Sequence, residues 1–174
     1  MNNLLIVGAG IYADVAAEVA VDMGCFEKIV FVDDNKMQTP SGAKVIGTTK
    51  DINQLACEFA NIFVAIGNSK IRLALLEKIT KEIECNIVTL ISPHAFVSPD
   101  AKLEKGCIVE PMAVVHTGCR ISMGCIISAG AVVNHASVCE EGVHVDCNAT
   151  VAGYSVVPKR TKVYSGTVFL NQKG

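Results

Sequence analysis

The chain has 174 residues, 15 Lys and Arg against 17 Asp and Glu, and a formal net charge of -2. This length is enough for one ordinary domain or two small ones with a real core. Because the charges nearly balance and no basic run occurs, nucleic acid is excluded as an expected partner.

The N-terminal segment and the cysteines indicate a compartment. The segment "MNNLLIVGAG" has neither a basic n-region nor a long apolar region, so we expect no signal peptide and a cytoplasmic protein. The eight cysteines include no Cys-x-x-Cys pair. A thiol-reducing compartment fits them better than a disulfide framework, and we expect no structural metal site.

The first half of the chain alternates between strand and helix patterns. The predicted strands are 4–7, 28–34, 62–68 and 85–91, and the predicted helices are 11–24, closed by Gly24, 51–60 and 69–82. Alternation of this kind predicts a parallel, Rossmann-like α/β domain, which we place at residues 1–90.

The first predicted turn indicates a nucleotide site. Gly8 and Gly10 begin a Gly-x-Gly-x-x-Ala turn, and Asp33 ends the next strand. Glycines let a phosphate approach a helix N-terminus, and the aspartate can hold a hydroxyl group. About ninety residues make only half of a dinucleotide fold, so a mononucleotide or nucleotide-sugar fits better than NAD. The alternative is that these residues are only tight turns between strand and helix.

The second half repeats every six residues. Of fourteen positions spaced by six from Ile91, twelve are Val, Ile or Leu: Ile91, Val97, Leu103, Val109, Val115, Ile121, Ile127, Val133, Cys139, Val145, Val151, Val157, Val163 and Phe169. A second column, from Ala95 to Thr167, holds only small or β-branched residues. Neither a helix nor a plain strand has a period of six, whereas a solenoid of hexapeptide repeats does. The same period argues against a membrane span in the uncharged stretch between Arg120 and Glu140.

This register predicts an all-β solenoid domain over residues 91–174. It resembles the left-handed parallel β-helix of the hexapeptide-repeat acyltransferases, in which eighteen residues make one triangular coil. Cys107 and Cys125 are eighteen residues apart and should stack in the column of small side chains. Cys139 occupies an inward position as a small hydrophobic residue. We interpret these three cysteines as structural.

Both halves together resemble one family over essentially the whole chain. The matching stretches are "IVGAG", "FVDDN", "FVAIGNSKIR", "ISPHAFVSPDA" and "NHASVCEEGVHVDCNATVAG". They are similar to the bacterial sugar O- and N-acyltransferases related to sialic acid O-acetyltransferases and to acetyltransferases of UDP-amino-sugars. The resemblance implies a homotrimer with acetyl-CoA lying along the β-helix between adjacent subunits.

The resemblance also implies roles for individual residues. The nucleotide-sugar pocket would be lined by Gly8, Gly10, Asp33, Asp34, Gly67 and Asn68. We also expect Tyr12 in this pocket, although the family commonly has His at that position. His135 would be the general base, His144 a second active-site histidine, and Gly153 a backbone donor to the thioester carbonyl of acetyl-CoA. The family usually has Asp or Glu after the catalytic histidine to orient its ring, whereas this chain has Ala136, so we expect the ring to be held less firmly.

The spacing of His135 and Gly153 supports these two roles independently. The two residues are eighteen apart, so in a β-helix they should lie one above the other, about 4.8 Å apart. An imidazole can remove the proton of the acceptor as it attacks, and an N–H can stabilise the oxyanion. The alternative is that His135 and His144 are only polar residues on outward faces of the coil. His94 and His116 fit a structural role better.

The sequence therefore predicts a cytoplasmic, trimeric, acetyl-CoA-dependent acetyltransferase. Its acceptor would be an amino group of a nucleotide-activated sugar, because the nucleotide-type turn is present, or else a hydroxyl group of sialic acid or a similar glycan sugar. Ala136 and the short C-terminal part favour another hypothesis, a non-catalytic trimeric scaffold that binds a nucleotide-sugar. A nicotinamide oxidoreductase would need a second mononucleotide half.

Overall fold

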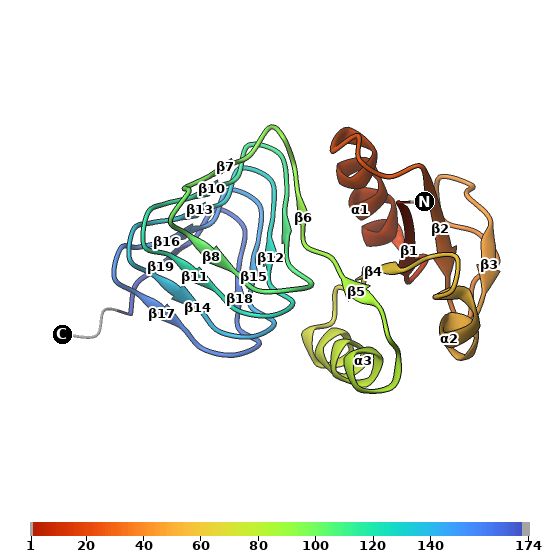
Figure 1. The fold of residues 1–174 in the computed structure, drawn as a ribbon. Coiled ribbons are helices and arrows are strands. Elements are labelled where there is room, and N and C mark those ends of the chain that lie inside the picture. Colours follow the sequence, from red (N-terminus) through yellow and green to blue (C-terminus); the bar gives the residue numbers. More distant parts are fainter. Residues whose placement is uncertain (1, 172–174) are drawn as a thin grey trace. The chain divides into compact units, whose positions relative to one another are not determined.

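The computed structural model describes residues 2–171. Its internal contacts divide the chain into two compact units, Met1–Val88 and Thr89–Gly174, and each unit is described by itself. Figure 1 labels their helices and strands in chain order.

The first unit is a parallel α/β sheet with the strand order β3-β2-β1-β4-β5 among its described residues. The strands are β1 (Asn3–Val7), β2 (Lys28–Val32), β3 (Val45–Gly47), β4 (Asn61–Val64) and β5 (Asn86–Ile87). The helices are α1 (Ile11–Asp22), the 3₁₀ turn η1 (Thr49–Asp51), α2 (Ile52–Leu55) and α3 (Ser69–Glu82). All five residues of β1 are buried, as expected for a central parallel strand. The strand order reverses between β1 and β4, where sheets of this type bind ligands.

Several details of this unit differ from the sequence-based prediction, among them the strand predicted at 62–68, which ends at Val64. The edge strand β3 was not predicted, because only three residues take part and two of them are not buried. The helix predicted at 51–60 is shorter, since α2 ends at Leu55. The strand predicted at 85–91 is divided, with β5 in this sheet and β6 (Leu90–Ile91) in the second unit.

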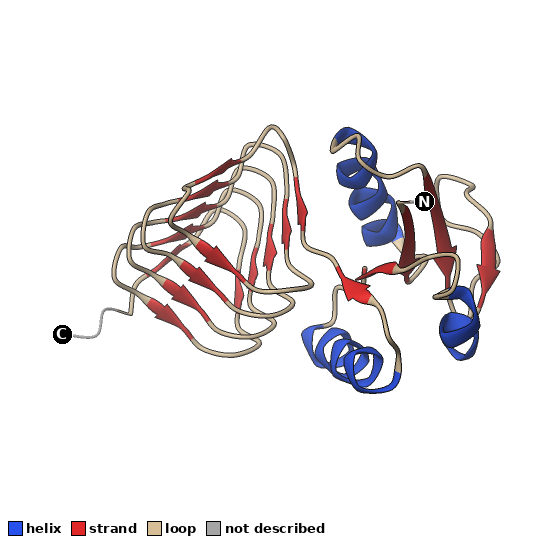
Figure 2. Cartoon of the chain, viewed as in Figure 1, coloured by secondary structure: helices blue, strands red, loops and turns tan. Residues whose placement is uncertain are grey.

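The second unit is a parallel β-helix built from strands of two residues (Figures 1 and 2). After β6 they are β7 (Phe96–Val97), β8 (Lys102–Leu103), β9 (Ile108–Val109), β10 (Val114–Val115), β11 (Arg120–Ile121), β12 (Ile126–Ile127), β13 (Val132–Val133), β14 (Val138–Cys139), β15 (His144–Val145), β16 (Thr150–Val151), β17 (Val156–Val157), β18 (Lys162–Val163) and β19 (Val168–Phe169). In the described part of the chain they form three sheets, ordered β19-β16-β13-β10-β7, β17-β14-β11-β8 and β18-β15-β12-β9-β6. Each strand pairs with the strand eighteen residues away, as Val133 does with Val115 and Val151. The predicted fold class is confirmed.

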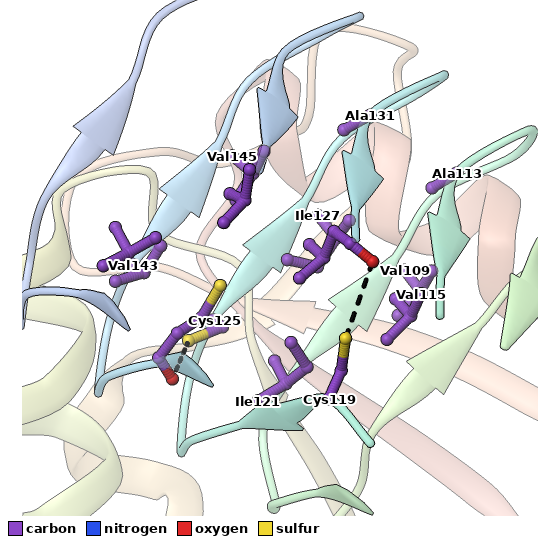
Figure 3. Packing of buried hydrophobic residues seen from close by; sticks show 14 of the residues in the cluster. Val109, Ala113, Val115, Cys119, Ile121, Cys125, Ile127, Ala131, Val143 and Val145 are labelled. Atoms are coloured by element: carbon purple, nitrogen blue, oxygen red, sulfur yellow. Dashed lines mark hydrogen bonds between the residues drawn. The ribbon is translucent and has the colours of Figure 1, made fainter. Parts of the chain in front are cut away.

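The core of the β-helix consists of the two columns that the period of six defines. The second residue of most strands points inward, and Val109, Val133 and Val151 are fully buried. The small residues that precede the strands fill the corners between them (Figure 3). Cys107, Cys125 and Cys139 are completely buried in this cluster, as predicted.

From Gly106 to Gly166, each corner of the coil contains one residue with a positive φ angle. These residues recur at intervals of six: Gly106, Met112, Gly118, Gly124, Gly130, Ala136, Gly142, Asn148, Tyr154, Arg160 and Gly166. An L-residue with a side chain pays roughly 1–2 kcal/mol for this conformation, which explains why glycine is frequent here. The five other residue types are therefore exceptions to the pattern, and two of them, Ala136 and Tyr154, lie next to His135 or contact it.

We predict that the cysteines differ sharply in reactivity. Burial raises the pKa of the Cys119, Cys125 and Cys139 thiols, so little of the reactive thiolate forms near neutral pH. In titration with an aromatic disulfide reagent, the exposed Cys25 and Cys57 should react at once. Cys107 and the three shifted cysteines should react only after denaturant unfolds the β-helix. Rapid reaction of all eight thiols in the native protein would contradict this packing.

Candidate active site

His135 lies in the turn that leads from β13 to β14, and its side chain is held by the residue before it. The backbone N–H of His135 donates to Oδ1 of Asn134 at 2.8 Å, and Nδ1 of the imidazole lies 2.8 Å from the same oxygen. A backbone N–H can only donate, so this atom of the amide is its oxygen, and Nδ1 must be the nitrogen that carries the proton. In the neutral ring Nε2 is then unprotonated and can accept a proton.

Gly153 lies directly over the imidazole, one coil further along the β-helix. A Cβ atom built on Gly153 would come within 2.9 Å of both Cε1 and Nε2 of His135. Any larger residue would therefore displace the ring. The expectation that residues 135 and 153 stack one above the other is confirmed.

Tyr154 adds a second contact to the same histidine. Its ring meets the His135 ring edge to face, with centroids 5.0 Å apart and planes at 86°. Its backbone N–H also donates to the carbonyl oxygen of His135 at 3.0 Å. The imidazole is therefore bounded by three residues: Asn134, Gly153 and Tyr154.

The core of the β-helix supports this turn from inside. The thiol of Cys119, one coil below, donates to the carbonyl oxygen of Asn134 at 3.1 Å. The buried hydroxyl of Ser137 donates to the carbonyl oxygen of Ala152 at 2.9 Å and accepts from the N–H of Ser155 at 3.3 Å. Two neighbouring coils are thus tied together on either side of the His135–Gly153 pair.

His144 belongs to a different cluster. Its Nε2 lies 3.1 Å from the hydroxyl of Ser128 and 3.7 Å from Oδ1 of Asp146. Asp146 also forms an ion pair with Lys162 at 2.9 Å. Burial of the Asp146 carboxyl acts to raise its pKa, but the hydrogen bonds from Lys162 and Cys147 and the nearby charges outweigh it and lower the pKa to about 2. Asp146 is therefore an anion at neutral pH beside this histidine.

The structure does not bring His135 and His144 together within one chain. His144 is on β15, in the sheet β18-β15-β12-β9-β6, whereas His135 lies in the turn between strands of the other two sheets. In a triangular coil that turn is opposite the sheet of His144 (Figure 1). The apolar core separates the two side chains, so a site containing both histidines needs two chains.

In the first unit, Gly8, Gly10 and Asp33 meet at the carboxyl ends of β1 and β2. Gly8 has φ +115°, and a Cβ atom on it would lie 2.9 Å from the carbonyl oxygen of Ala65. The carboxylate of Asp33 accepts hydrogen bonds from the N–H groups of Ala9, Asn35 and Lys36 at 2.8–3.0 Å. Since a carboxylate has about four acceptor positions, Asp33 mainly fixes these loops and has little capacity left for a ribose hydroxyl.

The other predicted pocket residues lie in different parts of the first unit. Gly67 and Asn68 follow β4 beside Gly8: Asn68 caps α3 by accepting from the N–H groups of Lys70 and Ile71, and the Cα of Gly67 faces open space. Asp34, in contrast, accepts from the N–H and hydroxyl of Thr49, on the side of η1. Tyr12 lies half-buried in the first turn of α1.

Comparison with known proteins identifies the family. The chain is 33% identical to the acetyltransferase domain of PglB from Neisseria gonorrhoeae, solved with acetyl coenzyme A. The TM-score is 0.93, and the match covers 99% of this chain and 84% of that one. The chain belongs to the hexapeptide-repeat sugar acyltransferases. Residues 3–79 of this acyltransferase also match the family described as the PglD N-terminal domain.

More distant structures share the fold of this acyltransferase. A variant of perosamine N-acetyltransferase from Caulobacter crescentus, solved with CoA and GDP-perosamine, is 23% identical with a TM-score of 0.67. That match covers 99% of this chain and 90% of the other. A comparison with curated proteins gave no match. Among residues 2–171, no helix is long and apolar enough to cross a membrane, and no group of three or more His, Cys, Asp or Glu side chains could hold a metal ion.

The sequence prediction missed two residues that contact His135. Ala136 suggested that the ring of this acyltransferase is loosely held, but the orienting oxygen comes from Asn134, on the other side of the histidine. The Asn-His dipeptide is the sequence signal that could have shown this. Tyr154 could have been found from the period, since it lies eighteen residues after Ala136.

We predict that neutral His135 carries its proton on Nδ1. In ¹⁵N-histidine-labelled protein above the histidine pKa, the His135 signals should show a protonated Nδ1 and an unprotonated Nε2. Asn134→Ala removes the acceptor, so it should shift the ring toward a mixture of tautomers. Assignment uses the signals lost in His135→Ala, and the three other histidines serve as internal controls. A protonated Nε2 in the unchanged protein would contradict the assigned hydrogen bond.

Proposed function

We propose that this acyltransferase transfers the acetyl group of acetyl-CoA to the amino group of a nucleotide-activated sugar, with His135 as the general base. The observation that carries the proposal is the imidazole whose Nδ1 binds Asn134 while its acceptor nitrogen, Nε2, lies against the backbone of Gly153. The solved PglB acetyltransferase domain with acetyl coenzyme A supports the donor.

The chemistry needs one proton transfer and one leaving group. Nε2 of His135 removes a proton from the acceptor nitrogen as that nitrogen attacks the acetyl carbonyl carbon. The C–S bond then breaks, and CoA leaves as its thiolate. The backbone of Gly153, stacked on the ring, is the candidate for contact with the thioester carbonyl as it gains negative charge.

The first unit is proposed to hold the nucleotide part of the acceptor. Gly8 and Gly10 keep side chains away from the end of β1, and Gly67 and Asn68 lie at the neighbouring end of β4, where parallel sheets bind ligands. Asp33 supports this site by fixing the loop that carries Ala9. This nucleotide-type site favours the amine of a nucleotide-linked amino sugar as the acceptor. The second candidate is O-acetylation of sialic acid or a glycan sugar, for which the same base would take a hydroxyl proton.

Asn134 weakens the case for a non-catalytic scaffold. That hypothesis used Ala136, which cannot orient a catalytic ring. Because Asn134 performs this orientation, Ala136 is not evidence of a disabled site. A scaffold would also have no need for a glycine that admits the imidazole so closely.

A homotrimer is proposed as the active form, and His144 as a contribution from the neighbouring subunit. Within one chain the two histidines lie on opposite sides of the β-helix, so only a second copy can place His144 near His135. The outward residues of the sheet containing β13 include Phe96, Val114, Val132 and Val168, which give a flat and largely apolar face of the kind that subunits bury.

We predict that His135→Ala lowers the rate constant for acetyl transfer by about 10²- to 10⁴-fold, the usual contribution of a general base. The assay is thiol release from acetyl-CoA with a panel of UDP-, GDP- and CMP-linked amino sugars, free amino sugars and sialic acids. Release with a nucleotide-linked amine identifies the proposed acceptor.

The control is His116→Ala, because the His116 ring meets the ring of Phe96 and is not part of the proposed site. This variant should keep the wild-type rate. Full activity in His135→Ala on the true acceptor would disprove the proposed base. Thiol release with a sugar hydroxyl, but with no amine, would establish the second candidate instead.

Subunit complementation tests the shared site. We predict a trimer by sedimentation, and strongly impaired homotrimers for His135→Ala and His144→Ala. When the two variants are unfolded and refolded together, some mixed trimers contain an interface with both histidines intact, so activity should return. Activity that stays absent, or a monomer at micromolar concentration, would rule out a site shared between subunits.

A further inference from the structure

Tyr154 occupies a backbone position that disfavours it. Its φ angle is +58°, in the left-handed region, and its side chain is 60% exposed. A bulky residue with a positive φ angle is a genuine outlier, and six of the described corner positions of this coil are glycine. Glycine here would remove the strain, and burial gives the tyrosine little in return.

The contact with His135 is what the tyrosine provides. The two rings meet edge to face at a centroid distance of 5.0 Å, within the range of favourable aromatic pairs. The backbone contributes equally to all residue types at this position, because the N–H of Tyr154 donates to the carbonyl oxygen of His135 whatever the side chain is. Only the aromatic ring distinguishes tyrosine from glycine.

Asn134 alone cannot fix the imidazole. A hydrogen bond to Nδ1 sets which nitrogen is protonated and holds one atom of the ring, but it leaves the ring able to tilt about that atom. Gly153 limits this motion where its backbone meets Cε1 and Nε2. A further direction of motion is blocked by the ring of Tyr154, which lies almost perpendicular to the imidazole.

We propose that Tyr154 is a positioning residue for acetyl transfer, whose ring keeps Nε2 of His135 aimed at the acceptor. This inference rests on the proposed role of His135 as the base. The conformational strain at Tyr154 is then retained because it serves a functional site. The neighbouring coils, which the hydroxyl of Ser137 joins by hydrogen bonds, hold the strained corner in place.

The experiment compares three substitutions of Tyr154 with a matched control. Tyr154→Phe keeps the ring and should stay within about twofold of the wild-type kcat. Tyr154→Leu and Tyr154→Gly remove the ring and should lower kcat by about tenfold or more, as is usual when an outer partner that orients a metal-binding histidine is lost. KM for acetyl-CoA and for the acceptor should change little.

Thermal unfolding separates this effect from a loss of structure. Tyr154→Gly relieves the positive φ angle, so its Tm should equal or exceed that of the unchanged protein while its activity falls. Met112→Gly is the control, because Met112 is also an exposed apolar residue with a positive φ angle, 62°, and has no part in the site. It should gain stability and keep full activity.

A double-mutant cycle shows whether Tyr154 acts through His135. In the His135→Ala background, Tyr154→Gly should change the residual rate by less than about twofold, since no ring remains to be positioned. An equal loss in both backgrounds would overturn the proposal. So would an unchanged kcat in Tyr154→Gly, or a raised KM alone, which would mean that the ring binds a substrate. If His135→Ala keeps its activity, the proposed function itself is wrong. If His135→Ala loses activity but Tyr154→Gly keeps it, only the proposed role of Tyr154 is wrong.

Discussion

The stacking of each residue over the residue eighteen positions away is the constraint on which the rest of the β-helix depends. It aligns the inward Val, Ile and Leu residues into one core and repeats a positive φ angle at each corner from Gly106 to Gly166. It also decides which residues meet outside the core. His135 contacts Gly153 because the two residues stack in successive coils. It contacts Tyr154 because Tyr154 stacks on Ala136, the residue that follows His135. The candidate site therefore consists of residues that lie next to one another in neighbouring coils.

Core and site are joined through a small number of buried polar atoms. The Cys119 thiol binds the carbonyl of Asn134, and the Ser137 hydroxyl bridges two coils. These small side chains fit the corner positions and satisfy backbone groups that would otherwise be buried without partners. An imidazole on such a turn needs no flexible loop to reach its orientation, which suits catalysis by a positioned base.

The two units divide the chemistry proposed for this acyltransferase. The α/β unit supplies glycine turns at adjacent strand ends, and internal hydrogen bonds to Asp33 and Asn68 preform them. The β-helix supplies His135. His144 and its Ser128, Asp146 and Lys162 partners form a separate polar cluster on another face. A single chain thus keeps the two histidines apart, and only the proposed trimer would bring His144 of one subunit to His135 of another.

The sequence by itself determined the two folds, because periods of strand and helix in the first half, and of six in the second, are local consequences of how side chains alternate between core and solvent. It also placed Gly153 over His135, since residues that are eighteen apart in the sequence occupy the same position in successive coils. The short strand β3, the division of residues 85–91 between two sheets, and the oxygen of Asn134 required the tertiary structure. Edge strands of three residues and side-chain rotamers leave no periodic signal. The tertiary structure also decided the separation of His135 from His144. The two residues are nine apart, which is half of one coil, and in a closed triangular coil this spacing puts them on opposite sides of the core.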